Sequence, residues 1–292
     1  MATETIVTEH YNGKYPVAFY PQSHRRKIVG TKEWLDGVTS ATGMLDKSTP
    51  LLKWADGVVK SFLMAAMEAG EPLSEELINE AIGRREVEKT EAGDSGTLVH
   101  EWAEAYIKGQ NPKVPEDKAV RNGVLGFLKW VRDYDIKFLE SEKYVFSEKH
   151  WYHGIMDCSF TMGKKENHKI KHAGDFKTGS GIYVDQAFQV SAYQQADTEE
   201  HGTKYGSKWI LRFIKKDKYD KTGKILVQRA GDFEAKEFSA EEHEAHFQGF
   251  LACLKLKREN KIFDKKHGYN SDEKKEQRKK FKEELKNLTL SK

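Results

Sequence analysis

The sequence predicts an α/β protein, and three features support this fold class. Helical patterns dominate residues 38–134, and β-forming stretches alternate with helical ones after residue 136. The hydrophobic content is 38% over 292 residues, which suffices for a globular core. The chain has no strong Pro/Gly/Ser-rich linker, so its helical and β-rich portions are not expected to form independent domains.

The N-terminal portion predicts short strands and then a series of helices. Residues 5–30 alternate apolar and polar side chains between turn signals, which is typical of strands. The stretch VTSATGMLDKSTP predicts a capped helical turn and a loop, and the mostly apolar stretch that follows predicts a helix ending at Gly70. Three further helices are expected: 74–93 with Ser74 as its N-cap, a separate helix from about 94 to 109, and about 116–134.

The β-rich portion begins near residue 136. Three stretches rich in β-formers, EKYVFSEKHW, HGIMDCSFTM and IKHAGDFKTG, predict the consecutive strands of a meander. A helix follows and ends at Gly202, and then KWILRFIKK and KILVQRA predict two more strands. The last long helix is expected to have Ser239 as its N-cap. The chain thus divides into an N-terminal portion (1–135), a core of sheet and helices (136–260) and a charged tail (261–292).

The composition argues against several classes of protein. Two cysteines, Cys158 and Cys253, cannot form a disulfide framework or supply the four thiolates of an iron–sulfur cluster, so a reducing compartment is expected. No run of about 18 apolar residues is present, so no membrane span is expected. The N-terminus lacks the apolar segment of a secretory signal.

The net charge of +3 is unevenly distributed along the chain. The segment from Lys255 to Lys292 carries 14 Lys/Arg and 7 Asp/Glu, a local charge of +7, whereas the rest of the chain carries −4. A basic tail on a mildly acidic body is typical of a segment that contacts a polyanion. A solvated helix of mixed charge is the alternative interpretation.

Asp175 and Lys177 are the first candidates for a functional site. Residues two apart in a strand share a face, so these two side chains are expected on one polar face while Phe176 points into the core. A meander would also bring Asp157, from the preceding strand, close to Asp175. Two close carboxylates repel unless a cation or proton lies between them, and oxygen ligands favour Mg²⁺ or Mn²⁺ over zinc. A surface ion pair between Asp175 and Lys177 is the alternative.

Two pairs of helical residues add to this pattern. GTLVHEWAEAYIKG places His100 and Glu104 one turn apart, and QVSAY places Gln189 and Tyr193 one turn apart on the helix after the candidate strand. Each pair also has an ordinary structural interpretation, as a half-buried histidine and as a core tyrosine beside a surface glutamine.

In this order, the motifs resemble the RecB-type branch of the PD-(D/E)XK nucleases. The matching elements, within residues 38–193, are Gly96 with His100, Gly154 with Asp157, Asp175 to Gly179, and Gln189 with Tyr193. VTSATGMLDKSTPLLKWA also resembles an N-terminal helical segment of phage and mitochondrial exonucleases of this branch. Only the joint order and spacing are specific. The resemblance implies a restriction-endonuclease-like core, with a mixed central sheet flanked by helices, a helical N-terminal portion and no iron–sulfur cluster.

The resemblance also implies a role for each matching residue. The implied metal ligands are His100, on the helix predicted over 95–109, Asp157, Asp175 and the backbone carbonyl of Phe176. Lys177 would be the catalytic lysine and would act together with Asp157 and Asp175. Gln189 and Tyr193 would lie at the edge of the site and hold the DNA strand or the lysine. Glu101 and Glu104 would reach a second metal or its water ligands.

The implied activity is hydrolysis of DNA phosphodiester bonds by water, with Mg²⁺ or Mn²⁺ as the cofactor. The resemblance favours an exonuclease for free, preferably single-stranded, DNA ends, in recombination, repair or degradation in a bacterial or phage-infected cytoplasm. DNA and a recombination or replication protein are the implied partners. The alternatives are an endonuclease and a non-catalytic module that binds DNA ends. Trp54, Trp102 and Trp130 are candidates to stack on bases, although large aromatic residues more often lie in cores.

A zinc site is the main alternative chemistry. Five candidate ligands lie close in sequence: His150, His153, Cys158, His168 and His172. A structural zinc site favours closely spaced Cys/His pairs, and only one cysteine is present among these residues. The stretch HEWAE differs from the zinc-protease motif H-E-x-x-H because Glu104 occupies the second histidine position, so a zinc protease is rejected.

Overall fold

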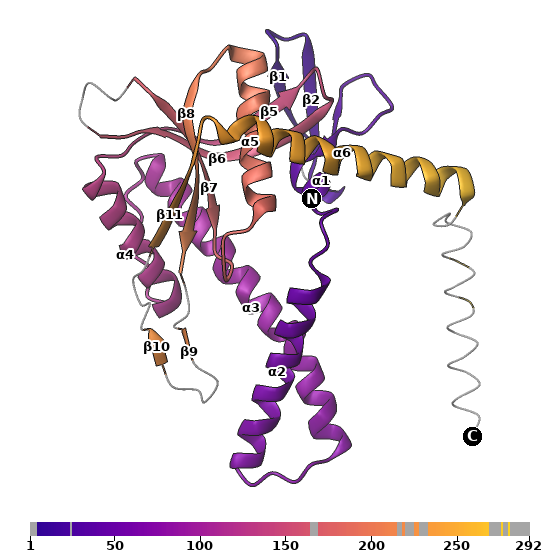
Figure 1. Cartoon of the computed structure of the whole chain (residues 1–292), viewed down its shortest axis with the longest axis vertical. Coiled ribbons are helices and arrows are strands. Elements are labelled where there is room, and N and C mark those ends of the chain that lie inside the picture. Colours follow the sequence, from indigo (N-terminus) through magenta and orange to yellow (C-terminus); the bar gives the residue numbers. More distant parts are fainter. Residues whose placement is uncertain are drawn as a thin grey trace.

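A mixed sheet flanked by helices forms the centre of the molecule (Figure 1). The computed structural model describes residues 5–23, 25–163, 169–214, 218–219, 225–227, 233–268, 276 and 280. Its elements are β1 (Ile6–His10), β2 (Tyr15–Tyr20), a 3-10 turn (Pro21–Ser23), β3 (Arg25–Ile28), β4 (Asp36–Gly37), α1 (Val38–Thr42), α2 (Ser48–Glu68), α3 (Glu75–Ile107), α4 (Lys118–Asp133), β5 (Lys137–Ser147), β6 (Tyr152–Thr161), β7 (Lys171–Lys177), α5 (Val184–His201), β8 (Tyr205–Phe213), β9 (Lys218–Tyr219), β10 (Ile225–Val227), β11 (Phe233–Ser239) and α6 (Glu242–His267). The predicted α/β class is confirmed.

The central sheet combines an antiparallel meander with a parallel crossover. β5 pairs with β6, and β6 with β7, in antiparallel fashion, so the three predicted consecutive strands are confirmed. β7 and β8 are parallel, because α5 carries the chain back across one face of the sheet. β11 is antiparallel to β8, and the short β4 is parallel to β6. Through β4, the N-terminal portion of the chain joins the same sheet as the β-rich portion.

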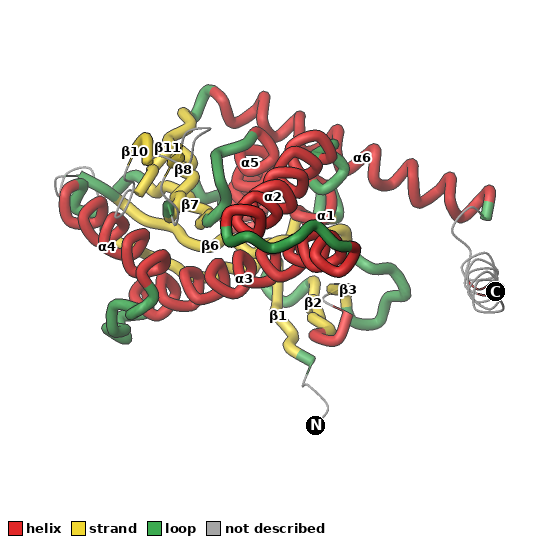
Figure 2. The backbone as a smooth tube through the Cα atoms, turned by 90° about the horizontal axis from the view of Figure 1, so that it is seen from below, coloured by secondary structure: helices red, strands yellow, loops and turns green. Residues whose placement is uncertain are grey.

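Two hydrophobic cores cover the two faces of this sheet. Figure 2 shows α3 and α4 on one side of the strands and α5 and α6 on the other. The core under α5 and α6 includes Val190 and Phe250, and the core under α3 and α4 includes Phe127 and Phe176. Burial of these large side chains is the main free-energy gain that fixes the helices on the sheet.

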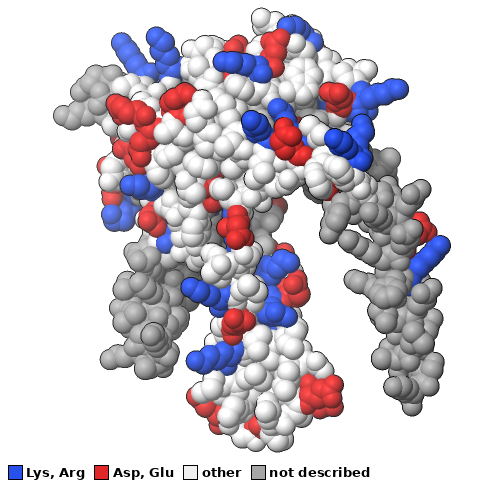
Figure 3. All heavy atoms as spheres, turned by 45° about the vertical axis from the view of Figure 1, so that its right-hand side comes forward, with Lys and Arg blue, Asp and Glu red and all other residues white. Residues whose placement is uncertain are grey.

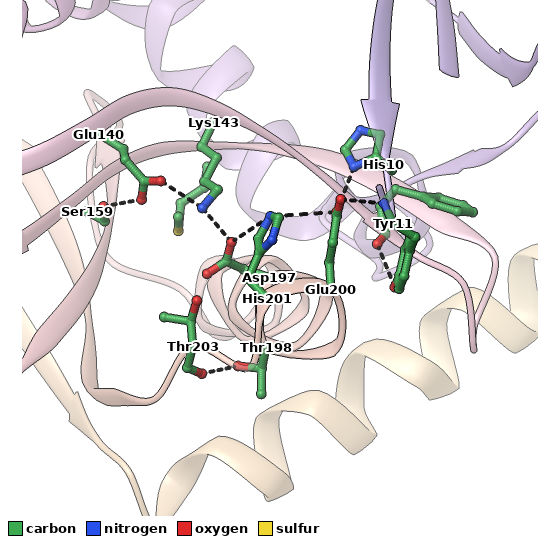
Figure 4. Close-up of polar contacts among 12 residues, drawn as sticks. His10, Tyr11, Glu140, Lys143, Ser159, Asp197, Thr198, Glu200, His201 and Thr203 are labelled. Atoms are coloured by element: carbon green, nitrogen blue, oxygen red, sulfur yellow. Dashed lines mark hydrogen bonds and ion pairs between the residues drawn. The ribbon is translucent and has the colours of Figure 1, made fainter. Parts of the chain in front are cut away.

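A separate three-stranded antiparallel sheet, β1–β2–β3, packs on Phe146 of β5. Polar contacts between α5 and the strands surround this junction (Figure 4). The Glu200 carboxylate accepts a hydrogen bond from the backbone N–H of Tyr11 and contacts the ring of His10, both at 2.7 Å. One turn away, Asp197 forms an ion pair with Lys143 of β5 at 2.6 Å. These contacts hold α5 against β1 and β5.

Helices α2 and α3 pack as a hairpin whose far end extends away from the sheet (Figure 1). Figure 3 shows much of this far end as uncharged surface, with Lys and Arg gathered where the hairpin meets the rest of the molecule. Exposed apolar side chains on the hairpin include Leu52, Met64 and Met67. Ser74 is the N-cap of α3, as predicted, because its hydroxyl accepts the backbone N–H of Leu77.

The predicted break between two helices near residue 94 is wrong, because α3 is continuous over 33 residues. The polar residues that suggested the break bond within the helix instead. The hydroxyl of Thr97 donates to the carbonyl of Gly93, and the hydroxyl of Ser95 donates to that of Ala92. Such bonds to the preceding turn let Ser and Thr remain inside a helix.

Other differences concern the C-terminal portion. β11 was not expected from the sequence, although it pairs with β8 over seven residues. Ser239 is the last residue of β11 and not the N-cap of α6; its backbone N–H donates to the carboxylate of Glu242, and the N-cap is Glu241. The strand expected over KILVQRA is described only as β10. Most of the charged tail, including 269–275, 277–279 and 281–292, lies outside the described residues.

Two of the three tryptophans proposed for base stacking lie in the core. Trp102 and Trp130 are buried under α3 and α4, where Trp102 stacks on Tyr106 and donates its indole N–H to the carbonyl of Lys113. Their faces are therefore covered, and the stacking proposal is wrong for both. Trp54 on α2 is 41% exposed.

Candidate metal and catalytic site

A cleft of about 980 Å³ opens beside β6. One edge of β6 pairs with β5 along its length, whereas the other edge pairs with β4 at Tyr152 and His153 and with β7 from Cys158 to Phe160. Residues 154–157 therefore have one edge without a strand partner among the described residues. The cleft forms at this gap, and residues from β6, β7, α1, α3 and α5 line it.

Asp157 lies where β6 and β7 separate. Its Oδ2 accepts a hydrogen bond of 2.6 Å from the backbone N–H of Phe176, in place of a further ladder bond between the strands. Gly174 supports this arrangement, because a side chain there would come within 2.6 Å of the Cys158 sulfur. The separation gives the carboxylate a fixed position at the mouth of the cleft.

Asp175 and Lys177 share a face of β7, as the sequence predicts. The Lys177 ammonium forms an ion pair with Oδ2 of Asp175, whose carboxylate is only 2% exposed. Phe176 points the opposite way, into the core under α3 and α4. Both polar side chains line the cleft, so the alternative of an isolated surface pair does not describe them.

His100 reaches the cleft from α3, which lies on the opposite face of the sheet from α5. Its Nδ1 lies 3.8 Å from Oδ2 of Asp157, and its ring contacts that of Phe176 edge-on. Gly96, one turn earlier, allows this close approach, because a Cβ there would lie 3.0 Å from the Thr178 hydroxyl. The pairing of Gly96 with His100 in the sequence therefore has a steric reason.

Glu142 is a cleft residue that the sequence prediction missed. Ligand atoms of His100, Glu142 and Asp157 lie within 4.8 Å of one another, and this is the single group of three such side chains in the described part of the chain. The β5–β6 register pairs Ser141 with Cys158 and Lys143 with Met156, which places Glu142 opposite Asp157. Counting back from the β5–β6 turn would have revealed this neighbour.

Asp175 does not belong to that three-residue group, although the sequence prediction names it as a metal ligand. Its carboxylate faces Lys177 instead. Its negative charge still acts on the group: it adds to burial in raising the pKa of Asp157, and it opposes the lowering of the His100 pKa by burial. The backbone of Phe176 also interacts with the His100 imidazole, so the strand segment proposed to supply a carbonyl ligand lies beside the group.

The pKa shifts in the cleft reflect an excess of buried negative charge. Burial, followed by the charge of Asp175, raises the pKa of Asp157 well above its usual range. Burial and the charge of Glu104 raise the pKa of Glu142. Burial alone would lower the pKa of Lys177, but the carboxylates of Asp175 and Asp157 outweigh it and leave that pKa raised. Clustered acids of this kind are stabilised by a bound cation.

Burial lowers the pKa of His100 despite the neighbouring acids. The imidazole is therefore neutral near pH 7, which is the form that binds metals. With the carboxylates of Glu142 and Asp157, it completes a donor set of one nitrogen and several oxygens. This donor set suits a hard or intermediate divalent cation.

Gln189 and Tyr193 line the cleft from α5. The Gln189 amide donates to the hydroxyl of Thr42 at 2.9 Å, which ties α5 to α1. Tyr193 packs directly on Gly154, where a Cβ would come within 2.4 Å of its ring. Burial and the charges of the nearby acids raise the Tyr193 pKa. Both residues thus line the same cleft as His100 and Asp157.

Glu101 and Glu104, which were predicted to reach a second metal or its water ligands, lie outside the group of candidate metal ligands. Glu101 is exposed on α3 and does not line the cleft. Glu104 forms an ion pair with Lys108, and its charge acts on Glu142. The acid that joins His100 and Asp157 in the cleft is Glu142, and neither Glu101 nor Glu104 belongs to that group.

The candidate zinc ligands do not form a cluster among the described residues. The His172 ring contacts the Ser207 hydroxyl at 2.6 Å, His153 contacts Arg26, and Cys158 is buried beside Gly174. His168 lies outside the described residues. The zinc alternative therefore finds no support in this part of the chain.

No protein-family model matches the chain, and a search of curated proteins finds no match. In the described part of the chain, the helices all fall short of the length and apolarity needed to cross a membrane.

Proposed function

We propose that the chain is a metal-dependent DNA nuclease with a PD-(D/E)XK core. The observation that carries the proposal is the convergence of Asp157, Asp175, Lys177 and His100 in one cleft, at the separation of two strands. These residues come from three elements, α3, β6 and β7, and all of them belong to the motifs that the sequence analysis identified. An accidental match of short motifs would not bring all of them together.

The residues of the cleft fit a Mg²⁺ or Mn²⁺ ion. His100, Glu142 and Asp157 would hold it, and Asp175 would add negative charge behind them. When bound, such a cation lowers the pKa of a water ligand and neutralises charge on a phosphate. Burial and the charges of neighbouring acids raise the pKa of Asp157 and Glu142, so a bound cation would stabilise their ionised forms.

Lys177 supplies a fixed positive charge next to the acids. Because its pKa is raised, it is an ammonium group at neutral pH and does not act as a base. We infer that it stabilises the charge that develops on the attacked phosphate. Asp175 positions it through their ion pair, and the hydrogen bond to Phe176 positions Asp157.

We further propose exonuclease action on linear DNA with single-stranded ends, in recombination, repair or degradation. The root of the α2–α3 hairpin lies at the cleft, because Lys47, just before α2, lines it and pairs with Asp185 of α5 at 2.6 Å. A hairpin anchored there restricts access from one side. End-labelled linear DNA should shorten progressively, and closed single-stranded circles should persist; rapid cutting of the circles would overturn this part of the proposal.

The decisive experiment compares Lys177→Met with Lys171→Met in a Mg²⁺-dependent nuclease assay. Lys171 is a matched control, because it lies on the same strand, is similarly exposed and pairs with an acid, Glu140, outside the cleft. We expect Lys177→Met to lose at least about 10²-fold in rate and Lys171→Met to retain activity. Thermal unfolding of both variants excludes misfolding as the cause. Full activity of folded Lys177→Met would refute the assignment.

A further inference from the structure

Arg26 is a buried arginine that lines the same cleft. It is 7% exposed, and its Nε is buried without a hydrogen-bond partner in the described part of the molecule. An arginine remains protonated at all ordinary pH values, and a buried charge without a counter-charge costs several kcal/mol. A residue in this state is expected to have a negatively charged partner.

The groups around Arg26 do not supply that charge. Its guanidinium lies over the rings of Phe19 and Tyr144, at 4.3 and 4.9 Å from their centroids, and Nη1 is 3.5 Å from Nδ1 of His153. Burial, followed by the charge of Arg26, lowers the pKa of His153 to about 3, so this ring is neutral. The described side chains that contact the guanidinium are therefore uncharged.

The nearby carboxylate of Asp36 is already neutralised. It pairs with Lys257 at 2.9 Å and with Arg258 at 2.8 Å. Two more basic residues, Arg25 and Lys261, also line this part of the cleft, and Arg25 stacks on Trp34 with its guanidinium carbon 4.2 Å from the ring centroid. The cleft thus contains an acidic group of residues at Asp157 and a separate basic group at Arg26.

We propose that Arg26 binds a phosphate of the same nucleic-acid strand whose scissile phosphate lies at the acidic group. This proposal rests on the proposed nuclease function and extends it by a second phosphate position. The Arg26 guanidinium retains, at Nε, an N–H group without a partner among the described residues, and a planar guanidinium is well suited to contact a phosphate through two parallel hydrogen bonds.

The spacing along β6 indicates how far apart the two phosphates lie. His153, which contacts Arg26, is four residues before Asp157, and four residues of strand span about 13 Å. Successive phosphates of one strand lie further apart through space than the rise of roughly 3.4 Å per nucleotide along the helix axis, so fewer than about four nucleotides separate the two positions. Binding should therefore strengthen when an oligonucleotide becomes long enough to reach both.

The first test measures oligonucleotide binding in EDTA, so that neither metal nor cleavage contributes. We expect Arg26→Met to weaken binding of a fluorescent oligothymidylate and to reduce the slope of log K against log[salt] by about 0.7, the value for one phosphate contact on a single strand. Lys129→Met is the matched control, since it removes one exposed positive charge from α4, outside the cleft. Equal affinity and equal slope for Arg26→Met and wild type would overturn the proposal.

The second test identifies the source of the phosphate. Oligothymidylates with a 5′-phosphate, a 3′-phosphate or hydroxyl ends are compared with a closed circle. If Arg26→Met weakens only one end-phosphorylated form, the bound group is that terminal phosphate. If it weakens all forms equally, the group is an internal phosphate. Either result supports the subsite.

The third test separates this subsite from the nuclease proposal. Inorganic phosphate is added at constant ionic strength, with chloride as the balancing salt, and the melting temperature is measured. We expect phosphate to raise the melting temperature of the wild type and not that of Arg26→Met. If this holds while no DNA is bound or cut, the anion site stands and the nuclease proposal fails. If DNA is cut and Arg26→Met changes neither phosphate nor oligonucleotide binding, only the subsite fails.

Stability without ligand provides the last readout. A ligand-binding role predicts that Arg26→Met is at least as stable as the wild type in chloride buffer, because it removes an uncompensated buried charge and retains the apolar contacts with Phe19 and Tyr144. A purely structural role predicts a lower melting temperature together with unchanged phosphate binding, and that combination would refute the proposal.

Discussion

Glu142 on β5 lies directly opposite Asp157 on β6, and both carboxylates contribute to one group of candidate metal ligands. Glu142 has a positive φ of 51°, a conformation that non-glycine residues seldom adopt. Five other non-glycine residues of the described chain also have a positive φ and do not line the cleft. The position opposite Asp157 is therefore the observation that identifies Glu142 as a candidate ligand.

The first prediction concerns this carboxylate. Glu142→Gln should weaken Mn²⁺ binding by at least about tenfold, because it removes a negative oxygen ligand while preserving shape. Binding is measured by electron paramagnetic resonance of free Mn²⁺ or by calorimetry. Glu101→Gln serves as the control, since Glu101 is exposed outside the cleft and its loss should leave binding unchanged. Equal weakening by both variants would indicate a diffuse charge effect and no defined site.

The second prediction concerns the contact between Gly154 and Tyr193. Gly154→Ala should lower the free energy of unfolding by about 1–3 kcal/mol, because the new methyl group would overlap the buried tyrosine ring. Gly83→Ala is the control: Gly83 lies in α3 with open space around it, and alanine should stabilise the helix by up to about 1 kcal/mol. Urea unfolding measures both, and a neutral Gly154→Ala would contradict the packing described here.

The third prediction concerns stability in acid. Burial would raise the pKa of Asp197, but hydrogen bonds from Lys143 and Tyr205 outweigh it and leave that pKa lowered. A lowered folded-state pKa stabilises the protein above the unfolded-state value, about pH 4, and the stabilisation is lost as pH falls further. Asp197→Asn should therefore reduce the free energy of unfolding by about 1–3 kcal/mol at pH 7 and flatten its dependence below pH 4. Parallel curves for variant and wild type would contradict this.

The fourth prediction concerns Lys208, which is buried on β8 with no hydrogen bond to its ammonium group among the described residues. Burial lowers its pKa to about 8. A lowered lysine pKa means that the unfolded chain binds more protons between pH 8 and about 10.4, so wild-type stability should rise with pH in that range. Lys208→Met should remove this rise and stabilise the protein at pH 7, by an amount on the order of 3 kcal/mol at most.

Lys236→Met is the control for that measurement. Both lysines lie near the ring of Phe238, with Nζ 5.9 Å from its centroid for Lys208 and 5.7 Å for Lys236. Lys236, however, is exposed on β11. Its replacement should change stability by less than about 0.5 kcal/mol. Stabilisation of similar size by both replacements would mean that the effect arises from the change in net charge and not from burial.

The sequence predicted local features well where a single physical signal decided them. The side-chain alternation around Phe176 placed Asp175 and Lys177 on one face, and the cap at Ser74 began a helix as expected. It failed where a polar, glycine-containing stretch could be accommodated within a helix. Gly93 to Thr97 resemble a helix end, yet bonds within the helix keep α3 intact.

The site was predictable to the extent that its residues stand in motifs. Glu142 stands in none, and only the strand register reveals it as the neighbour of Asp157. Arg26 was missed for a similar reason. Its significance comes from burial without a counter-charge, a property of the folded molecule that no pattern in the chain displays.

The unbroken course of α3 has a mechanical consequence. At 1.5 Å per residue its 33 residues form a rod about 50 Å long. The N-terminal part of this rod belongs to the projecting hairpin, and its C-terminal part buries Trp102 and carries His100. One continuous helix joins the two parts. A displacement of the hairpin relative to the sheet would therefore have to bend α3 or move its C-terminal part, which carries His100.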